Sequence, residues 1–439
     1  MQFPRIDPPA GRLGAWLVAF LLAAPAGAAA QATRPGAPLS LDAVHQRVAD
    51  ANPMLASLRA EAAATAYRVE PASALPDPTL EIGTLNRDLG NDLALMPFSG
   101  MNMLGLRQML PMGGVLGSAG QAAEARRDAA EATATAGGLE LRTMTTMVFL
   151  DLWATDRSLG IAIETRELVR AAARAAEAMY RVGRGRQADV VRAQAEVTRM
   201  SEEIVRMDAL RRQEAAALGR LLDLDLDPDT LAVAEPAFPA AIPGPDSLVS
   251  LALDRRPALA AGEARVVAAE ADVSRAAGMR WPELELGVQY GWRPMERGTD
   301  RMLSVMADVS LPIWAGRKQN RMLDEAHAMA RKDAEDLRDL RAATRGEVRT
   351  AWERWSEAVR LGSLYLGDLL PQARAALAAA DAAYGVGEVD FMTLLDAQMT
   401  LNRIRQEQFR IAAARGNALA TLEELTGTVL ASRPAEEVR

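Results

Sequence analysis

The side chains with the most evident chemistry in this sequence are thioethers. The chain has 20 methionines, and five of them fall in one short stretch, at Met96, Met101, Met103, Met109 and Met112. Thioether sulfur is a soft donor that suits Cu(I) or Ag(I). Met96, Met101 and Met103 are therefore candidate metal ligands. The alternative is that these flexible side chains serve adaptable packing in strands and loops.

Catalytic chemistry has little support. The chain contains no cysteine and only two histidines, His45 and His327. Both lie in helical, charge-rich segments, where we expect surface positions. An enzyme needs titratable groups that converge in a concave site, and the sequence contains no such constellation. We therefore predict neither an enzyme nor a bound cofactor.

The first thirty residues are typical of a secretory signal peptide. Arg5 and Arg12 precede an apolar run from Leu13 to Ala24, and Ala28-Ala29-Ala30 forms a small-residue cleavage pattern before Gln31. The run is shorter than the ~20 apolar residues of a spanning helix. We expect residues 1–30 to be removed, and no later stretch of ~18 residues is free of charge.

The charge pattern argues against nucleic acid as a partner. The formal net charge is −8, and positive residues are interspersed with negative ones. Binding to nucleic acid requires a basic patch or stripe, and no basic block occurs.

The chain is a tandem duplication. Asn52-Pro53-Met54-Leu55 recurs as Arg256-Pro257-Ala258-Leu259, and Ala178–Gly183 recurs as Ala382–Gly387. Both pairs share one offset, as 256 − 52 and 382 − 178 are each 204. Self-similarity at a fixed spacing is the signature of a repeat. We predict repeats at 39–235 and 246–430, a proline-rich linker at 236–245, and a tail at 431–439.

Two segments in each repeat read as strands. Residues 283–292 alternate strictly between apolar and polar or glycine, and a partner follows at 302–311. The first repeat has weaker equivalents at about 79–85 and 103–110. Such alternation is the lipid-out, lumen-in pattern of a membrane β-barrel strand, although a half-buried soluble sheet would give the same pattern. Four strands per chain cannot close a barrel, so if these are membrane strands the chains must pool them, giving eight from two chains or twelve from three.

Long helical hairpins follow the strands, at 118–222 and 317–427. No proline interrupts 118–180, and a helix of that length would reach roughly 90 Å at ~1.5 Å per residue. Pro371 predicts a kink or break in the second hairpin. The apolar positions are mainly alanine, so each hairpin needs neighbours to bury its surface.

This pattern resembles the TolC-like outer-membrane efflux factors over about residues 39–430. The most specific motifs are Tyr180–Gly183 with Asp189–Gln194, and Tyr384–Gly387 with Leu394–Gln398. The resemblance implies an α+β, mostly α fold: a homotrimer with a twelve-stranded outer-membrane barrel, continued by a long α-helical periplasmic tunnel. It also implies a periplasmic membrane-fusion adaptor and an inner-membrane RND-type pump as partners.

The resemblance assigns roles to residues at the hairpin tips. Asp396 matches an aspartate that rings the periplasmic gate, whereas the family's other ring position is Thr393 here, and Asp390 lies one turn away. Tyr384 and Asp189 match a polar link that ties the closed state, and Arg192 is a candidate partner of Asp189 or Glu388. The turns match the adaptor-docking tips, which here comprise Val182, Gly183, Arg184, Val386, Gly387 and Glu388. Without the family match, these carboxylates would read as solvated helix-face residues.

The expected function is an outer-membrane exit duct of a tripartite efflux pump. Residues 101–111 resemble the heavy-metal branch of the family, so the cargo is expected to be heavy-metal cations or drugs. Two alternatives stay open. One is the exit duct of a type I protein-secretion system, which uses the same fold, and the other is a soluble periplasmic coiled-coil scaffold.

Overall fold

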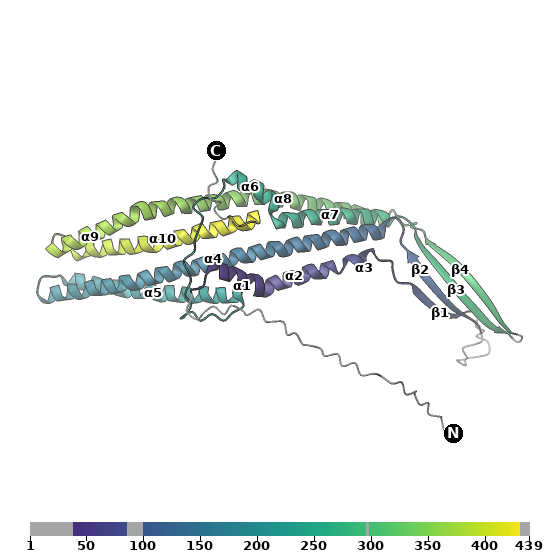
Figure 1. The fold of residues 1–439 in the computed structure, drawn as a ribbon, viewed down its shortest axis with the longest axis horizontal. Coiled ribbons are helices and arrows are strands. Elements are labelled where there is room, and N and C mark those ends of the chain that lie inside the picture. The colour runs from purple at the N-terminus through teal and green to yellow at the C-terminus, as the bar shows by residue number, and fades with distance from the viewer. Residues whose placement is uncertain (1–37, 86–99, 296–297, 431–439) are drawn as a thin grey trace, which may run out of the picture.

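The computed structural model describes residues 38–85, 100–295 and 298–430. The chain is elongated, with a small sheet at one end, two hairpin tips at the other, and helices running between them (Figure 1). The first half contains α1 (Leu41–Ala51), α2 (Pro53–Ala66), α3 (Val69–Ser73), β1 (Thr79–Leu85), β2 (Met101–Leu110), α4 (Val115–Arg181) and α5 (Gln187–Leu222). The second half contains α6 (Pro245–Arg255), α7 (Pro257–Gly278), β3 (Glu283–Met295), β4 (Gly298–Ser310), α8 (Gln319–Leu364), the π-helical turn η1 (Tyr365–Leu369), α9 (Leu370–Val386) and α10 (Phe391–Thr426).

The fold is mostly helical with one antiparallel sheet, as the sequence predicted. None of the helices in the described segments combines the length and hydropathy needed for a membrane span. We call α4–α5 the first hairpin and α8–η1–α9–α10 the second hairpin.

Each half begins with a helix that stops at a proline. Asn52 ends α1 and caps α2, because its side-chain oxygen accepts hydrogen bonds from the backbone of Met54 and Leu55. Its amide also donates to the carbonyl oxygen of Leu221 at 2.8 Å, which joins the short helices to the end of the first hairpin. Pro53 and Pro257 stand at the first positions of their helices, where the missing N–H costs no hydrogen bond.

The predicted break near Pro371 takes the form of a π-helical turn. Pro371 has no N–H to donate to the carbonyl oxygen of Gly367, four residues earlier. The i→i+5 turn η1 lies at this place, and α9 then begins with Pro371 in its first turn. Single π turns are rare within helices and are frequent at functional sites.

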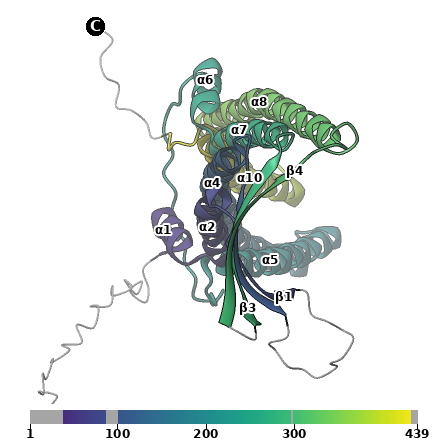
Figure 2. The same ribbon diagram turned by 90° about the vertical axis from the view of Figure 1, so that its right-hand side faces the viewer.

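The four strands form one curved antiparallel layer in the order β1-β2-β3-β4 (Figure 2). The pairing of β2 with β3 joins the two halves of the chain, with Leu106 opposite Val288. Val288 in turn lies opposite Val305 of β4. β4 begins at Gly298, four residues before the predicted limit of 302.

The sheet has one apolar and one polar face, because directly opposite residues share a face. The apolar face is exposed in the single chain, with Ile82 at 79% and Val305 at 77%. Its other exposed members are Leu80, Leu104, Leu106, Leu286, Val288, Tyr290, Leu303 and Val309. The polar face carries an ion pair of 3.0 Å between Arg107 and Glu81.

The largest buried cluster lies midway along the helices. It joins α1, α4 and α5 through residues such as Val44, Phe149 and Leu218. His45 faces this region, and its Nε2 lies 2.7 Å from the Thr146 hydroxyl, so the expectation that both histidines are surface residues is wrong for His45. Burial, followed by the charge of Arg142, lowers the pKa of His45 to about 4. His327 is exposed.

Candidate functional site

The two hairpin tips are built by the same turn. Gly183 and Gly387 have φ angles of 75° and 81°, a left-handed conformation that favours glycine. The N–H of Gly387 donates to the carbonyl of Tyr384, and that of Glu388 donates to the carbonyl of Ala383 at 2.9 Å. The first tip repeats this pattern with Gly183 and Arg184. This pair of backbone hydrogen bonds ends a helix and satisfies its last carbonyl groups.

Each tip has a solvent-exposed apolar side chain next to a charged side chain. Val182 and Val386 are 68% and 74% exposed. Arg184 and Glu388 are also exposed and carry opposite charges. The turns therefore place the predicted docking residues on the outermost surface of the helical end (Figure 1).

Asp390 is the N-cap of α10. Its Oδ1 accepts hydrogen bonds from the hydroxyl and the backbone N–H of Thr393, at 2.8 Å and 3.0 Å. The pKa of Asp390 is lowered by these two bonds and then by the charges of Arg186 and Arg192. Thr393, which departs from the family pattern, thus holds a carboxylate one turn away from the expected ring position.

Tyr384 lies at the junction of the two hairpins. Its ring packs edge to face against Phe391, with ring centroids 5.9 Å apart. Partial burial and then the charge of Asp189 raise the pKa of Tyr384. The structure therefore places Tyr384 within electrostatic range of Asp189, although no hydrogen bond joins their side chains in the described chain.

Asp396 and Arg192 are exposed on α10 and α5. Their side chains form no hydrogen bond or ion pair within the described part of this single chain. Both side chains are therefore free to bind groups outside this chain.

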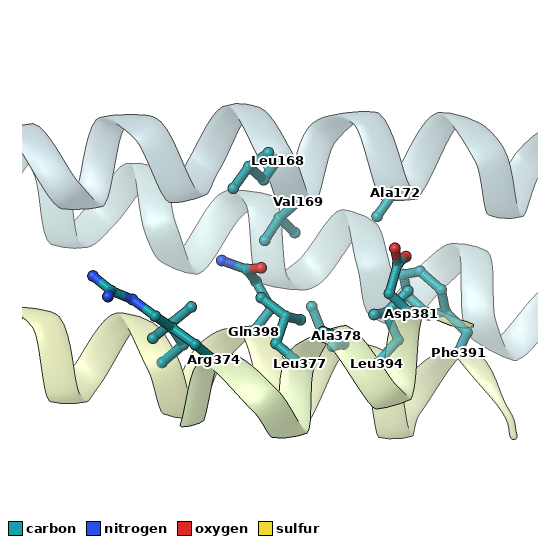
Figure 3. Close-up of a pocket in the computed structure, with 12 residues that line it drawn as sticks. Leu168, Val169, Ala172, Arg374, Leu377, Ala378, Asp381, Phe391, Leu394 and Gln398 are labelled. Carbon is teal, nitrogen blue, oxygen red and sulfur yellow. The ribbon is translucent and has the colours of Figure 1, made fainter. Parts of the chain in front are cut away.

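Next to the tips, the two hairpins leave a groove of about 470 Å³ (Figure 3). Leu168, Val169 and Ala172 of α4 face residues of α9 and α10 across it. Its polar members are Arg374, Asp381 and Gln398. Sequence reasoning did not identify this groove, because it depends on how far apart two helical hairpins lie.

A cluster of buried polar side chains was also not predicted from the sequence. Thr165, Asn402 and Gln406 are 0%, 4% and 7% exposed. The Thr165 hydroxyl donates to Oδ1 of Asn402 at 2.9 Å, and the Gln406 amide donates to Glu203 at 3.0 Å. The available signal was the i, i+4 spacing of Asn402 and Gln406 on one face of a helix.

Two of the three candidate metal-binding methionines lie on the polar face of the sheet. Met103 is directly opposite Gly291, which is directly opposite Met302. A Cβ atom at Gly291 would meet the sulfur of Met101 at 3.0 Å. Met101, Met103 and Met302 thus neighbour one glycine in the strand register. Met96 lies outside the described residues.

The family described as outer membrane efflux protein matches residues 44–223 and 248–428. No curated protein matches the chain.

Several solved structures share the fold. A membrane protein from Pseudomonas aeruginosa is 22% identical with a TM-score of 0.76, covering 88% of this chain and 93% of its own. The outer membrane protein VceC from Vibrio cholerae is 17% identical with a TM-score of 0.75, covering 89% and 96%. The Campylobacter jejuni CmeC outer membrane channel is 15% identical with a TM-score of 0.76, covering 90% and 87%.

Proposed function

The chain belongs to the outer membrane efflux protein family, as its resemblance to TolC-like factors predicted, and from that premise we propose that it is the exit duct of a tripartite efflux pump. The family is one of channels and not of enzymes. The duct lies in the outer membrane, receives cargo at the hairpin tips in the periplasm, and releases it at the sheet end. The single observation that carries this proposal is the exposed apolar face of the sheet, at the end of the chain opposite the tips.

Lipid is the partner that best fits that face. Ten apolar side chains exposed on one layer form a patch larger than isolated surface residues explain. In lipid, the open edges of β1 and β4 must pair, because unpaired backbone groups find no partner there. We propose that three copies pool their strands into a twelve-stranded barrel, with the helices continuing as a tunnel.

We propose that the chain consists of two repeats of helices, two strands and one long hairpin, 39–235 and 246–430, joined by the linker 236–245. Two observations support this assignment. The family matches the chain twice, and the proline-started helices α2 and α7 begin 204 residues apart, at Pro53 and Pro257.

The gate is proposed at the tips. Asp396 is exposed and free of partners in the described chain, which leaves it able to face its copies around a pore. A ring of carboxylates in a narrow mouth concentrates cations and repels anions. The charge of Asp189 is near enough to raise the pKa of Tyr384, after the larger effect of burial, and this supports the proposed link between the hairpins in the closed state. Asp390 and Arg192 contribute charge beside this link.

The outermost residues of the two turns are proposed to dock the periplasmic adaptor, which in turn connects the duct to an inner-membrane RND-type pump. Exposed Val182 and Val386 supply apolar contacts, and Arg184 and Glu388 supply opposite charges. Turns closed by backbone hydrogen bonds suit this purpose, because an ordered turn loses less conformational entropy when a partner binds.

Soft metal cations are proposed as one class of cargo. The supporting observation is that Met101, Met103 and Met302 flank Gly291 on the polar face of the sheet. In the proposed barrel this face lines the lumen, so the thioethers meet passing ions. Thioethers favour Cu(I) and Ag(I) over harder cations.

The proposal is tested by purifying the mature protein from outer-membrane fractions in detergent and measuring its mass by light scattering. We expect a complex of three chains that precipitates or aggregates when detergent is removed. A protein that stays monodisperse without detergent, as one or two chains, contradicts the duct and favours the coiled-coil scaffold.

A further inference from the structure

Two exposed tryptophans lie at the junction between the sheet and the helices. Trp281 precedes β3 and is 64% exposed, and Trp314 follows β4 and is 68% exposed. Because β3 and β4 pair from Glu283 and Ser310 onward, both tryptophans belong to the end of the sheet at which α7 enters and α8 leaves (Figure 1). Ile313 is also exposed there, at 74%. Exposed apolar side chains that gather in one place indicate a partner.

Backbone hydrogen bonds order the segments that carry these side chains. The N–H of Trp281 donates to the carbonyl of Gly278 at 3.0 Å. The carbonyl of Trp314 accepts from the N–H groups of Arg317 and Lys318, at 2.9 Å and 3.1 Å. Gly113 leaves room for the ring of Trp281, because a Cβ atom there would meet Cδ1 of the ring at 2.7 Å. The tryptophans are therefore exposed on a hydrogen-bonded backbone.

Three exposed cations accompany the tryptophans. Arg280 directly precedes Trp281, and Arg317 and Lys318 come one turn after Trp314. None of the three side chains forms an ion pair or a hydrogen bond with another residue of the described segments. We call Arg280, Arg317 and Lys318 the basic cluster. Its charges are free to bind an anion from outside the chain.

The acidic side chains at this end of the sheet lie on its polar face. Glu285 is directly opposite Asp308, and Glu283 precedes Glu285 by two residues on the same strand. Alternation along a strand places all three on the face that carries the ion pair of Arg107 with Glu81. The basic cluster lies beyond the ends of the strands, so the two kinds of charge are separated.

The first repeat makes the same junction without these residues. Asp77 stands 204 residues before Trp281 (281 − 77), and Gly113 stands 201 residues before Trp314 (314 − 113). The second offset is set by the match of Leu110-Pro111 with Leu311-Pro312. The fold of the junction therefore requires neither tryptophan nor positive charge, and the second repeat has them for another reason.

The apolar face of the sheet ends at this junction. Along β4 and its continuation it runs from Leu303 to Leu311, nine residues, and a tilted strand of ~9–11 residues spans a bilayer. Tyr290, opposite Leu303, lies toward the far end of this face. Tryptophan and tyrosine collect at the two levels where a bilayer meets water. In the proposed duct, Trp281 and Trp314 then lie at the headgroups of the leaflet that faces the periplasm.

We propose that the basic cluster, together with Trp281, Ile313 and Trp314, binds the headgroup of an anionic phospholipid in the periplasmic leaflet. The apolar side chains enter the boundary of the acyl chains, and the cations form charge-assisted hydrogen bonds with the phosphate. A headgroup of net negative charge is favoured over a zwitterionic one by charge complementarity. The inference rests on the proposed function, because a sheet in lipid brings headgroups to this level.

The test measures the thermal unfolding midpoint of the full-length protein, purified in a non-ionic detergent, during titration with lipid. A ligand that binds the folded state raises this midpoint. Phosphatidylglycerol, phosphatidylcholine with the same acyl chains, and inorganic phosphate are compared. We expect the wild type to bind phosphatidylglycerol about fivefold more tightly than phosphatidylcholine. High salt should reduce this preference, and inorganic phosphate should leave the midpoint unchanged.

The test variant combines Arg280→Gln, Arg317→Gln and Lys318→Gln, and it should bind the two lipids with equal affinity. A second variant, Arg280→Lys with Arg317→Lys, keeps the charges and should keep most of the preference, which separates charge from damage to the fold. The matched control removes three exposed charges further along α8 and should behave as the wild type; it combines Arg345→Gln, Arg354→Gln and Arg360→Gln.

The outcomes separate this proposal from the proposed function. A preference for phosphatidylglycerol that persists in the test variant overturns the lipid site, as does equal stabilisation by inorganic phosphate. Equal binding of both lipids by the wild type also overturns the site, but it leaves the sheet in a membrane. A wild-type midpoint that neither lipid changes contradicts the membrane placement itself, and with it the proposed function.

Discussion

The ring of Tyr384, the last aromatic residue of α9, packs edge to face on Phe391, the first residue of α10, with 5.9 Å between the ring centroids. The pair spans the tip turn and fixes the direction of the tyrosine hydroxyl relative to the first hairpin. The ring of Tyr384 makes the packing contact and the hydroxyl is the polar group, so a mutation can remove one and keep the other.

Tyr384→Phe keeps the ring and removes the hydroxyl that lies within electrostatic range of Asp189. If this group holds the gate closed with about 1 kcal/mol, its loss should raise the ratio of open to closed channels about fivefold. Single-channel recording in planar bilayers measures this ratio. Tyr180→Phe, at the matching position of the first hairpin, should change nothing. An equal ratio for the wild type and Tyr384→Phe removes the hydroxyl from the gate.

Gly387→Ala should loosen the second tip, whereas Gly385→Ala should not. The φ of Gly387 is 81°, and an alanine there costs about 1–2 kcal/mol. Gly385 lies in α9 with open space around its Cβ position, where alanine favours the helix by about 0.5–1 kcal/mol. Hydrogen exchange of the backbone amides at residues 383–390 should quicken in the first variant and stay equal or slow down in the second. Equal acceleration in both would show that the turn conformation is not what orders the tip.

Glu214 makes stability depend on pH. Burial raises its pKa to about 7, with the charge of Asp151 adding to the shift and a hydrogen bond from Thr155 opposing it. At pH values between the ordinary pKa of a glutamate and about 7, Glu214 keeps its proton in the folded chain and releases it in the unfolded chain. The free energy of unfolding therefore falls as pH rises through this window and stays low above it.

Glu214→Gln should remove this dependence. At pH 8 the variant should be more stable than the wild type by about 1 kcal/mol, a figure reduced because the carboxyl is partly exposed. Thermal unfolding midpoints at pH 5 and pH 8 measure the effect, with exposed Glu177→Gln of α4 as the control. A wild-type midpoint that rises between these pH values, relative to Glu214→Gln, contradicts the assignment.

The three thioethers around Gly291 should bind a soft cation. Replacing Met101, Met103 and Met302 together by leucine keeps their apolar volume and should lower the affinity for Ag(I) at least tenfold. Isothermal titration of the detergent-solubilised protein measures the affinity. Met109→Leu on the same polar face is the control. Equal Ag(I) binding by the triple variant and the wild type would assign these methionines to packing.

The elements of this chain could be predicted largely from local patterns. The hairpin turns follow from glycines that few other residues can replace at positive φ, and strict alternation at 283–292 reveals β3. Pro371 indicated a break, although a sequence does not say that the lost bond is absorbed by a π turn.

Contacts between distant elements could not be predicted in this way. His45 was expected at the surface, yet it bonds to Thr146, which lies 101 residues away. The partners of Asn402 and Gln406 are equally remote, on α4 and α5. Helical periodicity gives the face on which a polar residue lies but not the helix that covers it. The tip residues were identified from family resemblance, and their roles stay predictions.

The most direct test of the account is the ion selectivity of single channels in planar bilayers, compared between the wild type and Asp396→Ala. We predict small cation-selective currents for the wild type and a loss of selectivity in the variant, because in the proposed trimer the exposed carboxylate of Asp396 faces its copies at the pore mouth. Asp339→Ala, which removes an exposed charge of α8 far from the tips, should behave as the wild type. An absence of conductance in correctly assembled wild-type protein would contradict the channel itself, and unchanged selectivity in Asp396→Ala would contradict the acidic gate.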